Sequence, residues 1–273
     1  MFHSARQDFV LPYWQVARRS FQRYSTYRGA TAAGVFTNTV FGLMKVAVLL
    51  AVFRNRAQVG GFDVVDAVTF TFVAQGLLAT VGGFNGLALG DRIRTGDVVS
   101  DLYRPLHFQG YWLAEDLGRA GFQVLARGVP PVVVAALLFR LRLPSSAATW
   151  LVFAASLTLG LLISFACRFM VMTSGFWILD TRGPWQLAGS LILFFSGFVV
   201  PLSLFPGALR RFAATTPFPS IAQLPIEVFL GKHSGVSGAG SVLLRQALWA
   251  AAMLGLAELV VRRAFRKVVV HGG

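Results

Sequence analysis

The chain has 273 residues, of which 55% are hydrophobic and only 13% charged. A soluble domain typically has roughly 25% charged residues, so the composition argues against a soluble enzyme or binding domain. The net charge of +14 does not indicate a nucleic-acid partner, because the basic residues lie between apolar runs instead of forming one patch with aromatic side chains. A membrane is therefore the expected solvent for most of the chain, with lipid headgroups as the counter-charge.

Metal and redox chemistry have little support in the sequence. The single cysteine, Cys167, has no partner for an intramolecular disulfide and no CxxC neighbour. No histidine falls inside an apolar run, which argues against catalysis or haem ligation by an intramembrane histidine. We expect no metal site and no cofactor bound by this chain.

Residues 1–29 form the first predicted element. From Pro12 onward, apolar and basic side chains recur at helical spacing, which predicts an amphipathic helix lying in the membrane surface. Its apolar face contains Trp14, Ala17, Phe21 and Tyr24, and its polar face Arg18, Arg19, Gln22 and Arg23. A surface helix packed on protein is the alternative.

Six apolar runs follow, each long enough to span a membrane with some tilt, which predicts an all-α integral membrane protein with its transmembrane domain over residues 30–263. The runs are Thr31 to Phe53, Val65 to Leu89, Ala120 to Phe139, Ala147 to Cys167, Trp185 to Phe205 and Ser241 to Val261. Two connections are long: residues 90–119, and the proline-rich residues 206–240, which have room for two short helices that dip back into the interface. Residues 264–273 form a tail.

The basic residues predict the orientation of these spans. If both termini are cytoplasmic, about 15 Lys and Arg residues fall in cytoplasmic segments and about 7 outside, as the positive-inside rule requires. Basic clusters before the first span and after the last one, at 18–28 and 262–267, dominate this count. We therefore expect both termini, and the tail 264–273, in the cytoplasm.

Several residues inside the spans are candidates for packing or function. Gly82, Gly86 and Gly90 stand four residues apart, which predicts one glycine face for close helix packing, with a hinge as the alternative. Lys45 lies past the middle of the first span, where a cation is costly, so it is a candidate for the translocation path. It either faces a polar cavity at the seam between two copies of the chain or pairs with a carboxylate such as Asp66.

Three other ionisable residues fall in the predicted spans. Arg245 and Glu258 lie near the ends of the sixth span, where they can reach the membrane surface as anchors. Arg127 lies in the inner half of the third span.

The connection after the second span is the most informative segment. A polar, turn-forming stretch from Asp91 to Asp97 is followed by a short predicted helix from Val98, closed by Pro105. We expect Leu102 and Tyr103 to be exposed there without a partner in this chain. This favours a docking surface over a plain linker.

Two stretches resemble bacterial permeases of the type-2 ABC exporter class. Residues 92–106, RIRTGDVVSDLYRPL, resemble the "ir-G-l-…-L-rP" segment that follows the second span of these permeases. Residues 195–206, FSGFVVPLSLFP, followed by TPFP at 216–219 and Pro225, are similar to the proline-rich stretch at the outer end of their fifth span. Tyr103 departs from the family, which usually has a small or aliphatic residue there.

The resemblance implies six transmembrane helices, an interfacial N-terminal helix, a cytoplasmic coupling helix between spans two and three, and short re-entrant helices after span five. It also implies a multi-pass protein of the bacterial inner (plasma) membrane that works as a dimer with an identical or sister permease and two ATP-binding-cassette ATPase subunits. Contacts to the ATPase would be made by Arg94, Gly96, Asp97, Asp101, Leu102, Tyr103, Arg104 and Pro105.

The chain lacks its own ATPase motif. The nearest approach to a phosphate-binding loop, GKHS at 231–234, has no upstream glycine and a histidine at the hydroxyl position. ATP and Mg²⁺ would therefore be bound by the partner. The missing E-A-A-x-x-x-G loop of type-I importers favours export, so we expect a permease, without enzymatic activity, that exports an amphipathic, lipid-like or drug-like substrate.

Two other function classes are weaker alternatives. A membrane-embedded lipid-modifying enzyme needs a converging set of catalytic groups near one membrane face, whereas the expected depths in the membrane differ among Asp63, Asp66, Asp180, Glu227 and Glu258. An ion-coupled carrier needs broken helices with paired charges near the midplane, where only Lys45 and Arg127 come close.

Overall fold

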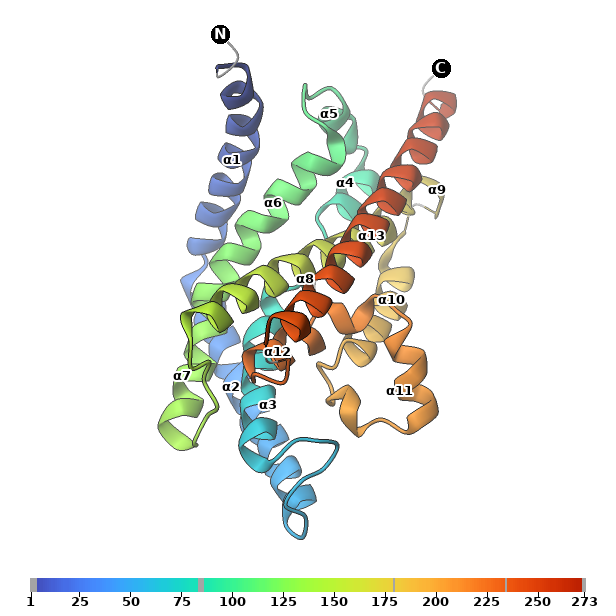
Figure 1. Ribbon diagram of the computed structural model, residues 1–273. Helices are drawn as coiled ribbons and strands as arrows, with labels where there is room; N and C mark the ends of the chain where they lie inside the picture. Colours follow the sequence, from blue (N-terminus) through green and yellow to red (C-terminus); the bar gives the residue numbers. More distant parts are fainter. Residues whose placement is uncertain (1–3, 83–85, 179, 234, 272–273) are drawn as a thin grey trace.

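The computed structural model describes residues 4–82, 86–178, 180–233 and 235–271, and this described part is helical (Figure 1). Helix α1 begins and α13 ends at the same end of the molecule, which we call the termini end. The α-helices are α1 (Ser4–Ser25), α2 (Arg28–Phe53), α3 (Val64–Thr80), α4 (Leu89–Thr95), α5 (Val98–Leu102), α6 (Phe108–Gln123), α7 (Val129–Leu138), α8 (Ala147–Thr173), α9 (Gly175–Ile178), α10 (Arg182–Phe195), α11 (Gly207–Ala214), α12 (Gln223–Phe229) and α13 (Gly235–His271).

Four helices are long and apolar enough to cross a membrane, namely Arg28–Phe53, Phe108–Leu138, Ala147–Ile178 and Gly235–Arg266, and Val64–Thr80 is a shorter apolar helix. Large apolar side chains such as Phe36, Met44 and Val48 on α2 are 59–71% exposed. An exposed apolar surface of this kind requires lipid or another protein chain. The predicted all-α, multi-pass membrane protein is therefore confirmed.

The centre of the bundle consists of α3 and α8. In the apolar stretch of α8, half of the residues are buried, compared with 11–22% in those of the other three long helices. Almost every residue of α3 is buried. Helix α3 starts with a capping box, in which Asp63 accepts a hydrogen bond from the Asp66 N–H and Asp66 accepts one from the Asp63 N–H. The remaining helices cover these two.

Two helices are shorter than the apolar runs that predict them. Helix α3 ends at Thr80 instead of Leu89, before Gly82 with its φ of +73°. Helix α10 ends at Phe195 instead of Phe205, before Gly197 with its φ of +89°. Only glycine adopts such a left-handed conformation readily, so both helices end where the backbone turns, although the side chains beyond remain apolar.

The long connections are more helical than the sequence indicates. The connection 90–119 is not a loop over its whole length, because α6 begins at Phe108 after an N-cap in which His107 accepts a hydrogen bond from the Gly110 N–H. Residues 206–240 contain the short helices α11 and α12, with α12 buried beside α8. The tail continues α13 as a helix to His271, and residues 272 and 273 lie outside the described part.

The N-terminal helix α1 lies side by side with α6 (Figure 1). It begins at Ser4, so Pro12 lies inside the helix and not at its first turn. Ala17 and Phe21 face α6, whereas Trp14 is 65% exposed. One face of α1 is therefore packed on protein, as the alternative interpretation expected. That the face with Trp14 inserts into the membrane surface stays a prediction.

A π-helical turn over Val124–Gly128 joins α6 and α7 into one long helix. Pro130 and Pro131 follow it and have no N–H groups to donate to the preceding turn, which accounts for the change of hydrogen-bond pattern. From this turn, Arg127 donates to the Ala30 carbonyl at 2.5 Å. The intramembrane cation Arg127 is thus bonded to the first turn of α2.

Candidate functional site

The α4–α5 segment, residues 89–105, lies at the termini end between α3 and α6 (Figure 1). Helix α4 ends at Gly96, whose φ of +84° reverses the chain into α5. Leu89, Ile93 and Val98 are buried in an apolar cluster with residues of α6, α8 and α13. The segment is therefore anchored on the long helices that end near it.

Asp101 holds the α4–α5 segment together. Its carboxylate is almost fully buried and accepts hydrogen bonds from Arg92 Nε at 2.6 Å and Arg92 Nη2 at 3.0 Å. Arg104 Nη2 lies 3.1 Å from Asp101 Oδ1, and the Arg104 guanidinium carbon lies over the ring of Tyr111, 4.3 Å from its centroid. Both contacts occupy Asp101 and Arg104 inside this chain.

The segment exposes a different set of residues from the expected one. Leu102 is half-buried against the apolar cluster, so the expectation that it is exposed without a partner was wrong. Tyr103 is 84% exposed and Val99, which sequence reasoning missed, is 47% exposed. The other exposed residues of the expected contact set are Arg94, Gly96, Asp97 and Pro105.

A buried charge cluster joins α6 to α8 and is formed by Asp116, Arg119 and Arg168, which are 3%, 8% and 1% exposed. Arg168 makes a bidentate pair with Asp116, at 3.0 and 2.5 Å, and Arg119 Nε donates to Asp116 Oδ1 at 2.8 Å. Sequence reasoning missed this cluster. It placed the first two residues in the connection 90–119 and Arg168 beyond the fourth span.

The cluster and the neighbouring Ser164 supply hydrogen-bond donors to the carbonyl groups at the C-terminal end of α3. Arg119 donates to the carbonyls of Ala79 at 2.7 Å and Thr80 at 2.9 Å, and Ser164 donates to the Val81 carbonyl at 2.6 Å. The last carbonyls of a helix have no partner within the helix and carry its negative dipole end. The two positively charged guanidinium groups are therefore balanced by the Asp116 carboxylate together with the partial negative charge at the C-terminal end of α3.

The three candidate glycines do not form one helix face, because α3 ends before Gly82 and α4 begins at Leu89. Each nevertheless marks a close approach to a side chain. A Cβ at Gly82 would lie 2.7 Å from the guanidinium carbon of Arg168, and one at Gly86 or Gly90 would lie 2.6 or 2.7 Å from Met172. Both of these side chains belong to α8, so all three glycines let the chain pass close to that helix.

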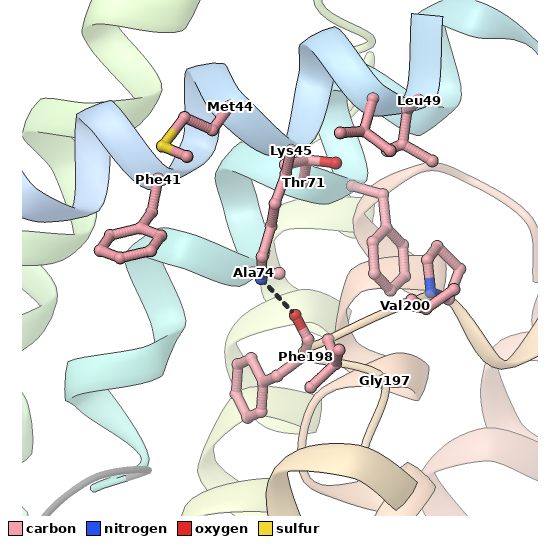
Figure 2. Close-up of a pocket in the computed structure, with 13 residues that line it drawn as sticks. Phe41, Met44, Lys45, Leu49, Thr71, Ala74, Gly197, Phe198 and Val200 are labelled. Carbon is pink, nitrogen blue, oxygen red and sulfur yellow. Dashed lines mark hydrogen bonds between the residues drawn. The ribbon is translucent and has the colours of Figure 1, made fainter. Parts of the chain in front are cut away.

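The Lys45 pocket is a cavity of about 350 Å³ between α2, α3 and the chain that follows α10 (Figure 2). Lys45 Nζ donates to the Phe198 carbonyl at 2.9 Å. This carbonyl is free because α10 ends at Phe195. The pocket is lined by Phe41, Met44, Lys45, Val48, Leu49, Phe70, Thr71, Ala74, Gly197, Phe198, Val199, Val200 and Pro201.

Lys45 does not pair with Asp66, which was one of the two expectations. The Asp66 carboxylate accepts a hydrogen bond from Lys232 at 2.5 Å, forms an ion pair with Arg142 at 3.1 Å, and takes part in the capping box of α3. Lys45 faces a pocket instead. The walls of that pocket are apolar, and the polar cavity between two copies of the chain, which was the other alternative, stays a prediction.

The carboxylates considered for an enzyme are mostly engaged in ion pairs. Asp63 and Asp66 share Arg142, Glu227 lies 2.8 Å from His233, and Glu258 accepts from Arg262 at 2.8 Å. In the described ranges, no group of three or more metal-ligating side chains is placed to hold a metal ion. Asp63 and Asp66 thus cap the start of α3, whereas Glu258 and Arg262 lie one turn apart inside α13.

Comparison with known protein families gives a match that includes the Lys45 pocket residue, the α4–α5 segment and the buried charge cluster. A family described as "ABC-2 family transporter protein" matches residues 40–272, a range that contains Lys45, the α4–α5 segment and the buried charge cluster. No curated protein and no solved structure matches the chain. Members of this family are membrane components of transporters and imply an ATPase partner. The chain belongs to the ABC-2 family of transporter proteins.

Proposed function

We propose that the chain is the permease subunit of an ATP-driven exporter, which moves an amphipathic, lipid-like or drug-like substrate out of a bacterial cell. Two separate ATPase subunits supply the energy, and a second permease, identical or a sister chain, completes the pathway. The observation that carries this proposal is the α4–α5 segment, which is internally fixed by Asp101 yet exposes Val99 and Tyr103. A rigid element with an exposed aromatic side chain suits the transmission of motion from a partner.

We propose six membrane crossings, in which the short helices α3 and α10 cross the membrane beside the four long helices. Helix α3 has 17 residues and α10 has 14, so they are only ~26 and ~21 Å long against a hydrocarbon core of ~30 Å. Directly after α10 the irregular chain is partly covered by protein, since Ser196 and Phe198 are buried and the Ser196 carbonyl accepts a hydrogen bond from the Gln223 N–H. Irregular backbone at membrane depth is tolerated where it is enclosed in this way.

We expect the side of the membrane toward the termini end to be cytoplasmic, because the basic residues 18–28 lead directly into α2 and the basic residues 262–267 lie near the end of α13. Asn55→Cys, in the exposed link after α2, should react with a membrane-impermeant maleimide in intact cells. Gln22→Cys, on the exposed side of α1, should react only after permeabilisation. Cys167 is buried and adds little background. Labelling at position 22 in intact cells would contradict this orientation.

The docking role is tested with the double variant Val99→Ala/Tyr103→Ala, co-expressed with the ATPase subunit that co-purifies with the wild-type permease. Because these exposed side chains contribute little to the permease itself, the variant should insert and purify normally. It should lose about 2–4 kcal/mol of ATPase association if both are hot-spot residues, and therefore lose the co-purifying ATPase.

The matched control is Tyr27→Ala/Val236→Ala, which removes the same side-chain types from exposed positions outside the α4–α5 segment and should retain the ATPase. Leu102→Ala is a different probe, because its half-buried side chain supports the segment. Retention of a functional ATPase by the Val99/Tyr103 variant would place the docking surface elsewhere.

A further inference from the structure

The ammonium group of Lys45 has no carboxylate partner in the described part of the chain. Its single hydrogen bond goes to the uncharged Phe198 carbonyl, and none of the residues that line the pocket is acidic. A lysine carries three N–H donors, so two remain for a ligand. Asp66 is held by Lys232 and Arg142 and does not supply the missing charge.

The position of Lys45 makes this charge costly without a ligand. The residue stands eight positions before the end of α2 at Phe53, which is ~12 Å along the helix axis. It therefore lies well inside the hydrocarbon core if α2 crosses the membrane. A cation at such depth typically pairs with another group and marks a pathway.

The walls of the pocket are suited to an apolar chain. Aromatic and aliphatic side chains from α2 and α3 line it, and the hydroxyl of Thr71 donates to the Ala67 carbonyl of its own helix. The volume of about 350 Å³ falls in the usual range of small-molecule pockets, roughly 300–1,000 Å³. Phe41, Met44 and Val48 at the α2 side are 52–67% exposed, so the pocket opens on the outer face of α2.

We infer that the Lys45 pocket binds amphiphiles that carry one acidic headgroup, with the anion against Lys45 Nζ and the apolar chain along Phe41, Met44 and Val48. An acid supplies the counter-charge that the protein lacks, whereas a neutral amphiphile of the same shape leaves the ammonium uncompensated. Cationic amphiphiles are repelled. That the bound acid is the exported substrate rests on the proposed function, but its binding to the permease does not.

The test measures binding to the purified permease in nanodiscs of uncharged-headgroup lipid, without ATPase or ATP. The probes are a medium-chain fatty acid with a fluorescent group at its far end and the methyl ester of the same molecule. Wild-type protein should bind the acid at least about tenfold more tightly, which corresponds to about 1.4 kcal/mol. Equal binding of acid and ester, or no binding of either probe, would overturn the inference.

Substitutions test whether Lys45 is the residue that makes the acid bind more tightly than the ester. Lys45→Met should remove the preference for the acid and keep binding of the ester, while Lys45→Arg should retain the preference. Arg245→Met is the matched control, since Arg245 is another cation in a long helix beside an apolar cavity, bonded to the Ala214 carbonyl, and its loss should leave the preference unchanged. A preference that survives in Lys45→Met would assign the anion to another site.

A further variant tests the apolar half of the pocket. Val48→Trp is expected to fold normally, because Val48 is 67% exposed, and to weaken both probes by filling the opening. Unchanged binding of both probes would show that the chain lies elsewhere. If acids bind as expected but ATP-driven transport of the same acid by the full complex is absent, the proposed export function is at fault and the binding site stands.

Discussion

Replacing Asp116 with Asn is expected to lower the free energy of unfolding by about 3–5 kcal/mol, the usual cost of leaving buried ions without their counter-charge. Asp116 is 3% exposed and is the single carboxylate between the guanidinium groups of Arg119 and Arg168. The substitution changes the formal charge of the cluster from +1 to +2. It keeps the shape of the side chain, so the loss comes from charge and not from packing.

Arg168→Met should cost less, about 1–3 kcal/mol. It leaves Asp116 paired with Arg119, which still donates to the Ala79 and Thr80 carbonyls. The formal charge of the cluster falls from +1 to zero. A double variant, Asp116→Asn/Arg168→Met, should be more stable than Asp116→Asn alone, because the loss of Arg168 lowers the formal charge of the cluster from +2 to +1.

Heating of detergent-solubilised protein followed by size-exclusion chromatography ranks these variants by the amount that stays folded. Arg262→Met is the control, since its pair with Glu258 on α13 is 69% exposed on the arginine side, and exposed pairs contribute only about 0–1 kcal/mol. If Asp116→Asn is as stable as wild type, or if the double variant is less stable than that single one, the cluster is not held by charge balance.

The sequence predicted the uninterrupted helices well because their apolar runs contain no sharp turn. Helix α2 ends at Phe53 and α8 begins at Ala147, as their runs predicted, whereas α8 continues to Thr173, six residues beyond the predicted end at Cys167. Helices α3 and α10 end earlier because Gly82 and Gly197 turn the backbone, and a hydropathy pattern continues across such a turn without change. The carbonyls freed there are bonded by residues far along the chain, so no local pattern reports the break.

The candidate site was predicted in part, for similar reasons. The depth of Lys45 in the membrane can be predicted by counting residues along its apolar run. Its hydrogen-bond partner cannot be predicted in this way, because the partner is the backbone carbonyl of Phe198, and every residue has such a carbonyl. The spacing of Asp116 and Arg119 fits an ion pair one turn apart on a helix, which was the available signal for the buried charge cluster. It was obscured because residues 90–119 were interpreted as a connection.

The second large effect is expected at the crossing of α1 and α6, where Gly118→Val should detach α1. A Cβ at Gly118 would overlap the Ala17 carbonyl oxygen and lie 2.9 Å from the Ala17 Cα. A clash with backbone cannot be relieved by a change of rotamer. Overpacking of this kind costs about 1–3 kcal/mol or more.

Other contacts between the two helices depend on this close approach. Phe21 meets Phe122 edge-to-face at 5.6 Å, Arg23 pairs with Glu115 at 2.5 Å, and the His107 N–H donates to Tyr13 at 3.1 Å. When the helices separate at Gly118, these contacts are lost together. Helix α6 directly follows the α4–α5 segment, so α1 braces the element that we propose to transmit motion from the ATPase.

Gly121→Val is the matched control on the same helix, because a Cβ there meets only Phe21 at the ordinary distance of 3.7 Å. Helix propensity slightly favours valine over glycine at both positions, so any loss at position 118 arises from the contact. Limited trypsin digestion at Arg18 and Arg19 should be at least about tenfold faster in Gly118→Val, which corresponds to about 1.4 kcal/mol of local stability, and unchanged in Gly121→Val. Equal digestion of the two variants would mean that α1 is held by its insertion into lipid and not by its packing on α6.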